Sequence, residues 1–250
     1  MDLKKTITSS QTPLINSWLQ IPSSFIAEIF AKSEVDLVTI DMQHGLIDYS
    51  DLVPMLQAIA SLPVLVRVPW NEPRSIMKAL DAGAAAIICP MINTKSEAER
   101  FVKTCKYPPQ GYRSYGPIRA NLSGTKDYVQ QANTEILTLA QIETEEAMDN
   151  LDDILAVDGL DGVYVGTIDL SISMGLEKHG KLSDPRLEEA VRLIGDKVKN
   201  AGKISCIHTM NPDDIPKVNS WGYHVITPLN DVSILKNQIG KILSDTRQLL

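Results

Sequence analysis

The sequence predicts a single (β/α)8 barrel, because eight short apolar runs recur along its 250 residues with amphipathic stretches between them. Each run is almost continuously apolar, as expected for a strand that is covered on both faces. No low-complexity segment or linker divides the chain, and a chain of this length can bury roughly three quarters of its unfolded surface in one core. An open doubly wound sheet is the alternative. It is disfavoured because no glycine-rich phosphate turn follows the first run.

The expected elements follow one another in a regular order. The apolar runs occupy residues 13–19, 35–41, 62–68, 84–90, 135–142, 161–166, 203–208 and 223–228. The amphipathic stretches between them include residues 24–33, 49–61, 74–83, 95–105 and 184–202. Several of these stretches begin after Ser, Asn or Asp and end in Gly or Ser, which are usual signals for the start and end of a helix. Strand and helix therefore alternate, and successive strands are expected to run parallel.

One connection, residues 106–134, is unusually long and rich in Gly, Pro, Tyr and Arg. Structureless connections of more than about 15 residues are usually functional or disordered. The basic and aromatic side chains of Arg113, Tyr115 and Arg119 suit closure over an anionic ligand. A structured insert that only covers the rim of the barrel explains the same composition, and the sequence leaves both interpretations open.

Composition limits the partners and the environment of the chain. Its net charge of −7 and the absence of any Lys/Arg-rich run argue against a nucleic-acid partner. No apolar stretch approaches the length of about 18 residues needed to cross a bilayer. The first residues lack the apolar segment of a secretory signal. The three cysteines are scattered without C-x-x-C spacing, which predicts reduced thiols in a cytoplasmic protein.

Two acids suggest a metal site. Glu143 and Asp169 each follow an apolar run and lie 26 positions apart, about one strand–helix repeat. Because parallel strands end at the same face of a barrel, both carboxylates are expected at the C-terminal ends of neighbouring strands. Converging carboxylates beside open positions suit a divalent cation such as Mg²⁺ or Mn²⁺. A single acid in such a place is more often a helix cap or a surface charge.

Two further polar side chains lie at or just after the ends of expected strands, as the two acids do, and they favour an active site there. His44 follows the second run, and Arg67 lies at the end of the third. Imidazole can accept and return a proton near neutral pH, and a guanidinium can stabilise a developing negative charge. A histidine without such neighbours is usually structural, which is the expectation for His179, His208 and His224.

These residue types predict chemistry on a 2-oxo acid. A divalent cation can bind the carbonyl and one carboxylate oxygen of such an acid and stabilise the enolate that forms beside them. The backbone N–H groups of residues 166–168 suit the substrate carboxylate. No lysine directly follows an expected strand, which disfavours a Schiff base, and no cysteine has a histidine in phase. The predicted reaction is retro-aldol cleavage to pyruvate enolate.

Six segments, in this order and spacing, resemble one known family. They are IDMQHG, PVLVRVPWNEP, LDAGAAAIICPMINT, YPPQGYRSYG, QIETEEAMDNLDDIL and DGVYVGTIDLSISMG. The chain resembles the metal-dependent class II pyruvate aldolases of the HpcH/HpaI group, which includes 4-hydroxy-2-oxoheptanedioate and 2-dehydro-3-deoxy-sugar-acid aldolases. The resemblance runs from about residue 14 to the C-terminal stretch. It implies one domain, residues 1–250, with a barrel of the phosphoenolpyruvate/pyruvate-binding type.

The resemblance also implies a role for individual residues. The general base of the family corresponds to His44, the aspartate paired with that base corresponds to Asp81, and the arginine that stabilises the transition state corresponds to Arg67. The metal ligands correspond to Glu143 and Asp169. The substrate contacts correspond to Gln141, Gly166, Thr167, Ile168 and Asp169. The implied cofactor is Mg²⁺ or Mn²⁺, with Co²⁺ as a further option. The expected topology places Asp81 at the end of a helix, across the barrel from His44. Gln43 and Met42 depart from the acidic and small residues that are frequent in the family.

These residues are compatible with three functions. The leading one is reversible, metal-dependent cleavage of a 4-hydroxy-2-oxo acid to pyruvate and an aldehyde. An acyl-CoA lyase of the malyl-CoA or citramalyl-CoA type is the second, although the acidic chain offers little of the basic groove that coenzyme A requires. A barrel that binds metabolites without turnover is the third, and the presence of His44, Arg67, Glu143 and Asp169 together argues against it.

The C-terminal stretch bears on assembly. Val232, Leu235, Ile239 and Ile242 form an apolar stripe at helical spacing. Such a stripe is expected to pack on the strands of its own barrel. The resemblance implies another arrangement, in which this helix exchanges between the subunits of a homo-oligomer, most simply a hexamer. The loop with Arg113 and Arg119 would then close over an active-site opening that another chain completes.

Overall fold

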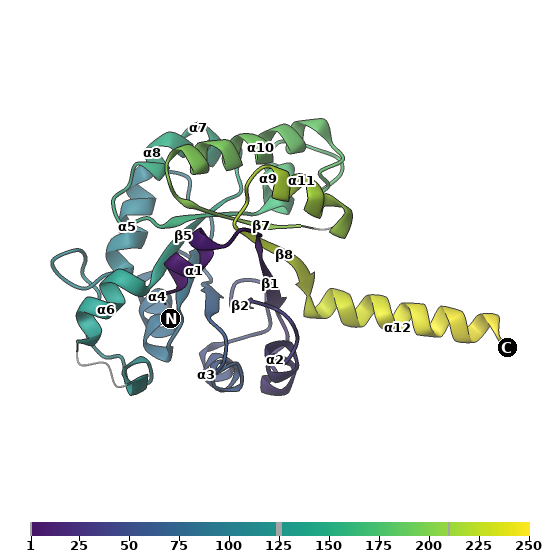
Figure 1. Cartoon of the computed structure of the whole chain (residues 1–250), viewed down its shortest axis with the longest axis horizontal. Coiled ribbons are helices and arrows are strands. Elements are labelled where there is room, and N and C mark those ends of the chain that lie inside the picture. The colour runs from purple at the N-terminus through teal and green to yellow at the C-terminus, as the bar shows by residue number, and fades with distance from the viewer. Residues whose placement is uncertain (1, 124–126, 210) are drawn as a thin grey trace.

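Eight parallel strands form a closed barrel, which confirms the predicted fold (Figure 1). The computed structural model describes residues 2–123, 127–209 and 211–250. The strands are β1 (Leu14–Leu19), β2 (Leu37–Asp41), β3 (Val64–Arg67), β4 (Ala86–Cys89), β5 (Leu137–Ile142), β6 (Gly162–Val165), β7 (Ile204–His208) and β8 (Val225–Asn230). Each strand lies within or largely within one of the predicted apolar runs. Strand β8 pairs with both β7 and β1 and thereby closes the barrel.

Helices follow the strands and cover the outside of the barrel. They are α2 (Ser24–Ala31), α3 (Tyr49–Ala58), α4 (Pro73–Ala82), α5 (Lys95–Cys105), α6 (Tyr128–Glu135), α7 (Glu145–Asp149), α8 (Leu151–Leu155), α9 (Thr167–Ser173), α10 (Pro185–Asn200) and α11 (Ile215–Ser220). Local sequence explains their ends. Helix α5 starts with a capping box of Thr94 and Glu97, and α4 stops at Gly83, whose φ of 104° is a left-handed value that suits glycine.

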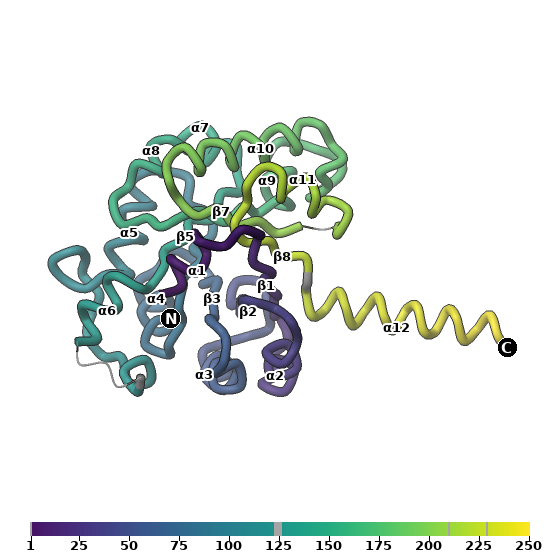
Figure 2. The backbone as a smooth tube through the Cα atoms, in the orientation of Figure 1, coloured from purple at the N-terminus to yellow at the C-terminus, as the bar shows by residue number. Residues whose placement is uncertain are grey.

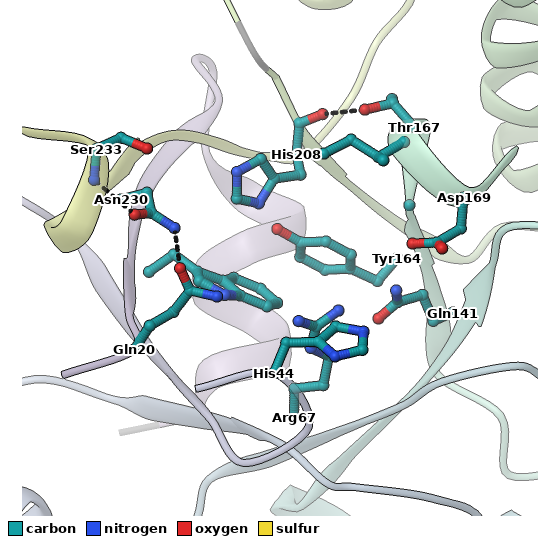
Figure 3. Close-up of a pocket in the computed structure, with 13 residues that line it drawn as sticks. Gln20, His44, Arg67, Gln141, Tyr164, Thr167, Asp169, His208, Asn230 and Ser233 are labelled. Carbon is teal, nitrogen blue, oxygen red and sulfur yellow. Dashed lines mark hydrogen bonds between the residues drawn. The ribbon is translucent and has the colours of Figure 1, made fainter. Parts of the chain in front are cut away.

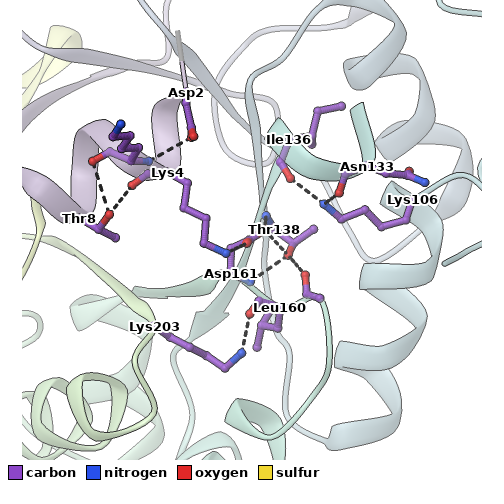
Figure 4. Close-up of polar contacts among 12 residues, drawn as sticks. Asp2, Lys4, Thr8, Lys106, Asn133, Ile136, Thr138, Leu160, Asp161 and Lys203 are labelled. Carbon is purple, nitrogen blue, oxygen red and sulfur yellow. Dashed lines mark hydrogen bonds and ion pairs between the residues drawn. The ribbon is translucent and has the colours of Figure 1, made fainter. Parts of the chain in front are cut away.

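The N-terminal end of the barrel is closed by a short helix, α1 (Leu3–Ser9). Leu3 and Ile7 are buried in the cluster of side chains that fills the barrel interior. Between them, the ammonium group of Lys4 lies 2.7 Å from the carboxylate of Asp161, which also accepts hydrogen bonds from Thr138 (Figure 4). Because α1 blocks this end, a ligand reaches the barrel axis from the opposite end.

The long connection between α5 and β5 is a structured insert. It contains a 3-10 turn, η1 (Ala120–Ser123), and α6. Arg113 is buried and donates to Asp81, while Arg119 donates to the backbone carbonyls of Ala82 and Leu56. The insert joins the end of a helix to the start of a strand, so it lies at the N-terminal end of the barrel. The interpretation that it closes over the mouth of its own chain is therefore wrong.

The last helix, α12 (Asp231–Gln248), extends away from the barrel (Figures 1 and 2). Only its first residue, Asp231, is buried; this carboxylate accepts hydrogen bonds from the backbone N–H groups of Gln20 and Ile21. The predicted apolar stripe is exposed along its length, so the expectation that it packs on its own strands is not met. The side-chain exposures are 43% for Val232, 46% for Leu235, 55% for Ile239 and 54% for Ile242.

The structure also bears on the predictions about the cysteines and about membrane-spanning segments. Cys89, Cys105 and Cys206 are free thiols, and all three are buried. None of the helices in the described ranges combines the length and the apolar character that a bilayer crossing requires.

Candidate active site

A cavity of about 420 Å³ opens at the C-terminal ends of the strands (Figure 3). Every sequence-predicted site residue except Asp81 and Glu143 lines it, and Glu143 lies directly beside it through its bond with Gln141. The residues around the cavity are Trp18, Gln20, His44, Arg67, Gln141, Tyr164, Gly166, Thr167, Ile168, Asp169, His208, Asn230 and Ser233.

Arg67 is fixed by a buried carboxylate that the sequence analysis did not single out. Asp41 ends β2 directly beside Arg67 in the sheet, and its two oxygens accept from Nε at 2.9 Å and Nη2 at 2.7 Å. Burial alone would raise the pKa of Asp41, but the bond to Arg67 and its positive charge lower the pKa below its ordinary value. The guanidinium also lies 4.7 Å from the ring centre of Trp18. Among the described residues, Nη1 of Arg67 has no hydrogen-bond partner, which leaves it available to a ligand.

The same carboxylate shapes the turn that carries His44. Oδ1 of Asp41 accepts from the backbone N–H groups of Gln43 at 3.0 Å and His44 at 3.3 Å. Gly45 allows this turn to stay tight, because a Cβ at that position would lie 2.1 Å from the carbonyl oxygen of Asp41. This turn places the exposed imidazole of His44 at the cavity. Asp41 therefore positions both the predicted base and the predicted arginine.

Glu143 follows β5 beside Gln141, at the edge of the cavity, and is 2% exposed. It accepts a hydrogen bond from the backbone N–H of Met91 at 2.8 Å and another from the amide of Gln141. Met91 has a φ of 53°, a left-handed value that costs about 1–2 kcal/mol for a residue other than glycine. Gly166 provides room, since a Cβ there would lie 2.6 Å from Oε2 of Glu143. The surrounding backbone is thus adapted to this carboxylate.

The two predicted ligands form a donor set that fits a divalent cation. Burial raises the pKa of Glu143, the two hydrogen bonds oppose that rise, and the negative charge of Asp169 adds to it. Asp169 is exposed in the first turn of α9. The buried Oε1 of Gln141 has no hydrogen-bond partner among the described residues. No group of three or more His, Cys, Asp or Glu side chains in those residues could hold a metal. Two carboxylates would leave the remaining coordination positions to water and substrate, as Mg²⁺ prefers.

Asp81 does not join this group within the chain. It lies in the last turn of α4, at the N-terminal end of the barrel, and its Oδ1 accepts from Nη2 of Arg113 at 2.7 Å. This position agrees with the topology expected from the sequence and leaves a contact with His44 of the same chain out of reach.

Several residues at or beside the cavity were not predicted from the sequence. Asp41, which holds Arg67, could have been found, because it precedes Arg67 by the same 26 positions that separate Glu143 from Asp169. A carboxylate that ends an apolar strand also requires a buried partner. His208 was expected to be structural, yet it lines the cavity. The remaining residues come from the ends of β1, β6 and β8 and from α12, where no pattern distinguished them; they are Trp18, Gln20, Tyr164, Asn230 and Ser233.

Comparison with known proteins agrees with this geometry. A 4-hydroxy-2-oxo-heptane-1,7-dioate aldolase of Salmonella dublin is 39% identical over 196 residues, which cover 76% of this chain and 74% of that protein. A hydroxypyruvate/pyruvate aldolase of Rhizorhabdus wittichii is 37% identical over 254 residues and covers 100% of both chains. The crystal structure of an HpcH/HpaI aldolase/citrate lyase family protein from Burkholderia cenocepacia superimposes with a TM-score of 0.90 at 32% identity, over 98% of both chains.

Residues 15–231 match the HpcH/HpaI aldolase/citrate lyase family as a whole. The barrel, the cavity and the aldolase relatives lead to one conclusion: the chain belongs to the HpcH/HpaI aldolase/citrate lyase family and is a carbon–carbon lyase of the aldolase type.

Proposed function

We propose that this aldolase reversibly cleaves a 4-hydroxy-2-oxo acid to pyruvate and an aldehyde through the enolate of pyruvate. The observation that carries the proposal is the guanidinium of Arg67, which Asp41 holds through Nε and Nη2 at the wall of a cavity that also contains His44 and Asp169. Its Nη1 makes no hydrogen bond to any residue that the structure describes. Cleavage of the bond between C3 and C4 places negative charge on the oxygen at C2, and a fixed guanidinium at that oxygen stabilises the charge as it develops.

The remaining residues divide between proton transfer and binding. His44 removes the proton of the C4 hydroxyl during cleavage and exchanges a proton at C3 of pyruvate. Thr167 and Ile168 open α9 with N–H groups that have no partner inside the helix, and these bind the substrate carboxylate. The N–H of Gly166 already donates to the carbonyl of Ile142, so this glycine contributes space instead.

Glu143 and Asp169 are proposed to hold the divalent cation, and the choice among Mg²⁺, Mn²⁺ and Co²⁺ stays open. When bound there, the cation would supply positive charge near the developing enolate. The two carboxylates follow neighbouring strands. Burial raises the pKa of Glu143 and the negative charge of Asp169 adds to that rise, so a cation between them would be favoured, which supports this assignment.

The test is exchange of the C3 protons of pyruvate in D₂O, followed by NMR. Exchange is expected to stop after chelation and to resume when Mg²⁺ or Mn²⁺ is added. Glu143→Gln and Asp169→Asn should lose both exchange and Mn²⁺ binding, which calorimetry measures directly. Glu146→Gln is the matched control, because Glu146 is an exposed acid in neighbouring α7 and should retain both. Full metal-dependent exchange in Asp169→Asn would overturn the ligand assignment.

The proposal extends to assembly and location. We propose a homo-oligomer, most simply a hexamer, in which α12 packs its exposed stripe on a neighbouring copy. We also propose that Asp81 reaches His44 of another subunit, since the two lie at opposite ends of one barrel. The exposed stripe of α12 supports the first statement. A cytoplasmic location is proposed on the three buried free thiols.

A further inference from the structure

One wall of the cavity carries polar groups without formal charge. It is built from the ends of β1, β7 and β8 and from the first turn of α12. Figure 3 shows Gln20, Asn230 and His208 along this wall, with Gln141 and Asp169 on the other side of the cavity. Gln20 and Asn230 therefore lie across the cavity from Asp169, while His208 adjoins the proposed carboxylate-binding turn at Thr167. The side chains of the wall face the part of the substrate that the carboxylates and the N–H groups of that turn do not hold.

The imidazole of His208 is the central group of this wall. Its ring packs edge-on against Trp18 with 5.3 Å between the ring centres. Its backbone carbonyl accepts from the hydroxyl of Thr167 at 3.2 Å, which ties the end of β7 to the start of α9. The ring nitrogens of His208 make no hydrogen bond with the described residues, in contrast to His224, whose Nδ1 lies 2.9 Å from the hydroxyl of Ser205.

The charge state of His208 follows from its surroundings. Burial and the nearby positive charge of Arg67 lower its pKa to about 4, so the ring is neutral at neutral pH. A neutral imidazole offers one N–H donor and one nitrogen acceptor. A hydroxyl group has the same pairing of donor and acceptor, whereas an alkyl group leaves both nitrogens without a partner.

The neighbouring amides are held in place. Nδ2 of Asn230 donates to Oε1 of Gln20 at 2.7 Å, and Nε2 of Gln20 donates to Asp41 at 3.1 Å. Asn230 also accepts from the N–H of Ser233 at 3.0 Å. No lysine or arginine among the described residues contributes to this wall. The one guanidinium elsewhere in the lining, that of Arg67, is assigned to the oxygen at C2 of the 2-oxo acid, so a carboxylate on the aldehyde would find no further cation in the wall.

We propose that this wall binds the aldehyde half of the substrate and that His208 selects an aldehyde with a hydroxyl group on the carbon beside the carbonyl. This inference rests on the proposed aldol reaction and specifies its second substrate. An aldehyde that lacks the hydroxyl displaces water from the half-buried ring of His208 and leaves its two nitrogens unpaired. Sites built around such a pairing discriminate strongly against the analogue that lacks it.

The test compares three aldehydes with pyruvate as the common partner. Glycolaldehyde carries the hydroxyl, propanal replaces it by a methyl group of similar size, and succinic semialdehyde carries a carboxylate. The wild-type chain should show a kcat/KM for glycolaldehyde at least about tenfold above those for the other two. In His208→Leu the ratio of glycolaldehyde to propanal should fall to about one, and His208→Gln, which keeps a donor and an acceptor, should retain part of the preference.

His179→Leu is the matched control, because His179 is exposed in a loop away from the cavity, and its aldehyde ratio should equal that of the wild type. A ratio in His208→Leu equal to the wild-type ratio would overturn the inference. A wild-type preference for propanal or succinic semialdehyde would do so without any variant, even where His208→Leu fails to fold. Proton exchange of pyruvate in the wild type distinguishes failure of the proposed reaction from failure of the His208 hypothesis. Absence of exchange would contradict the reaction itself. Exchange without a preference for the hydroxyl would contradict only the role of His208.

Discussion

Two aspartate–arginine pairs lie at opposite ends of this barrel, and they are used differently. At the mouth, Asp41 and Arg67 come from adjacent strands and make two hydrogen bonds, one to each oxygen of the carboxylate. At the other end, Asp81 and Arg113 make one bond of 2.7 Å. Arg113 is stacked between aromatic rings, 4.6 Å from the centre of Tyr107 and 5.8 Å from that of Tyr128.

The two pairs differ in the surroundings of the guanidinium nitrogens that are not bonded to the aspartate. The remaining nitrogen of Arg67 meets an open cavity, so its charge is accessible to a ligand. The Nε and Nη1 atoms of Arg113 are buried and lack partners in the described part of the chain. This second pair holds the insert against α4. The same two residue types thus provide an anion-stabilising group in one place and a fastening in the other, and the open space beside the pair decides which.

The largest expected difference between the two pairs appears when each arginine is replaced by lysine. Arg67→Lys should lower kcat by about 10²–10³-fold, because an ammonium cannot hold both oxygens of Asp41 and also reach the substrate. Arg113→Lys should lower kcat by less than about tenfold and reduce the melting temperature, because it loses the stacking on two rings. Steady-state kinetics and thermal unfolding of both variants decide the matter. Equal kinetic losses at the two ends would contradict the distinction.

A second prediction concerns Asp81, which the proposed function places at His44 of another subunit. His44→Ala and Asp81→Ala should each be nearly inactive alone. Co-expressed chains of the two variants should regain activity at about a quarter of the sites, if subunits pair at random. His44→Ala mixed with Arg67→Ala is the control, since both residues line one cavity and no intact site can form. The absence of any gain in the first mixture would exclude a contact between subunits.

The smallest effect is on stability, and it depends on pH. Asp41→Asn should cost about 3 kcal/mol at pH 7, because the buried guanidinium loses its counter-charge. The pKa of Asp41 is lowered in the folded chain, so its stabilisation is present above its unfolded pKa of about 4 and is lost as the pH falls through the folded value. Urea titrations at pH 7 and pH 3 should show the gap between wild type and variant closing at the lower pH.

The exposed pair of Asp152 and Lys197 provides a reference for that measurement. Asp152→Asn should change the free energy of unfolding by no more than about 1 kcal/mol at either pH. A gap for Asp41→Asn as small as this one would show that the mouth pair contributes no more than a surface ion pair.

The sequence was sufficient for the barrel because its signal repeats. Eight apolar runs and the helix caps between them each point to the same fold, so an error in one boundary does not change the result. The same repeat brought His44, Arg67 and Asp169 to one cavity, since strand ends in phase meet at one face. Glu143 followed the same rule and reached the edge of that cavity.

Other features could not be read from spacing. The position of the insert depended on a rule of topology, namely that a connection from helix to strand lies at the N-terminal end, and its composition pointed to the wrong end. His208 ends a strand like the predicted residues, but only its three-dimensional neighbours, Trp18 and Thr167, separate it from a structural histidine. The apolar stripe of α12 does not specify the surface on which the helix packs, so its direction away from the barrel could not be read from spacing.

The bond between Gln20 and Asn230 has a consequence for the order of folding. It joins positions 210 residues apart, one just after the first strand and one at the end of the last. The entropy of closing so long a loop must be overcome before this contact can form. Until β8 docks between β7 and β1, a growing or refolding chain has two open sheet edges and lacks Asn230 from the wall that His208 shares. The proposed aldehyde-binding wall is therefore expected to be completed last, well after the helices and most of the strands are in place.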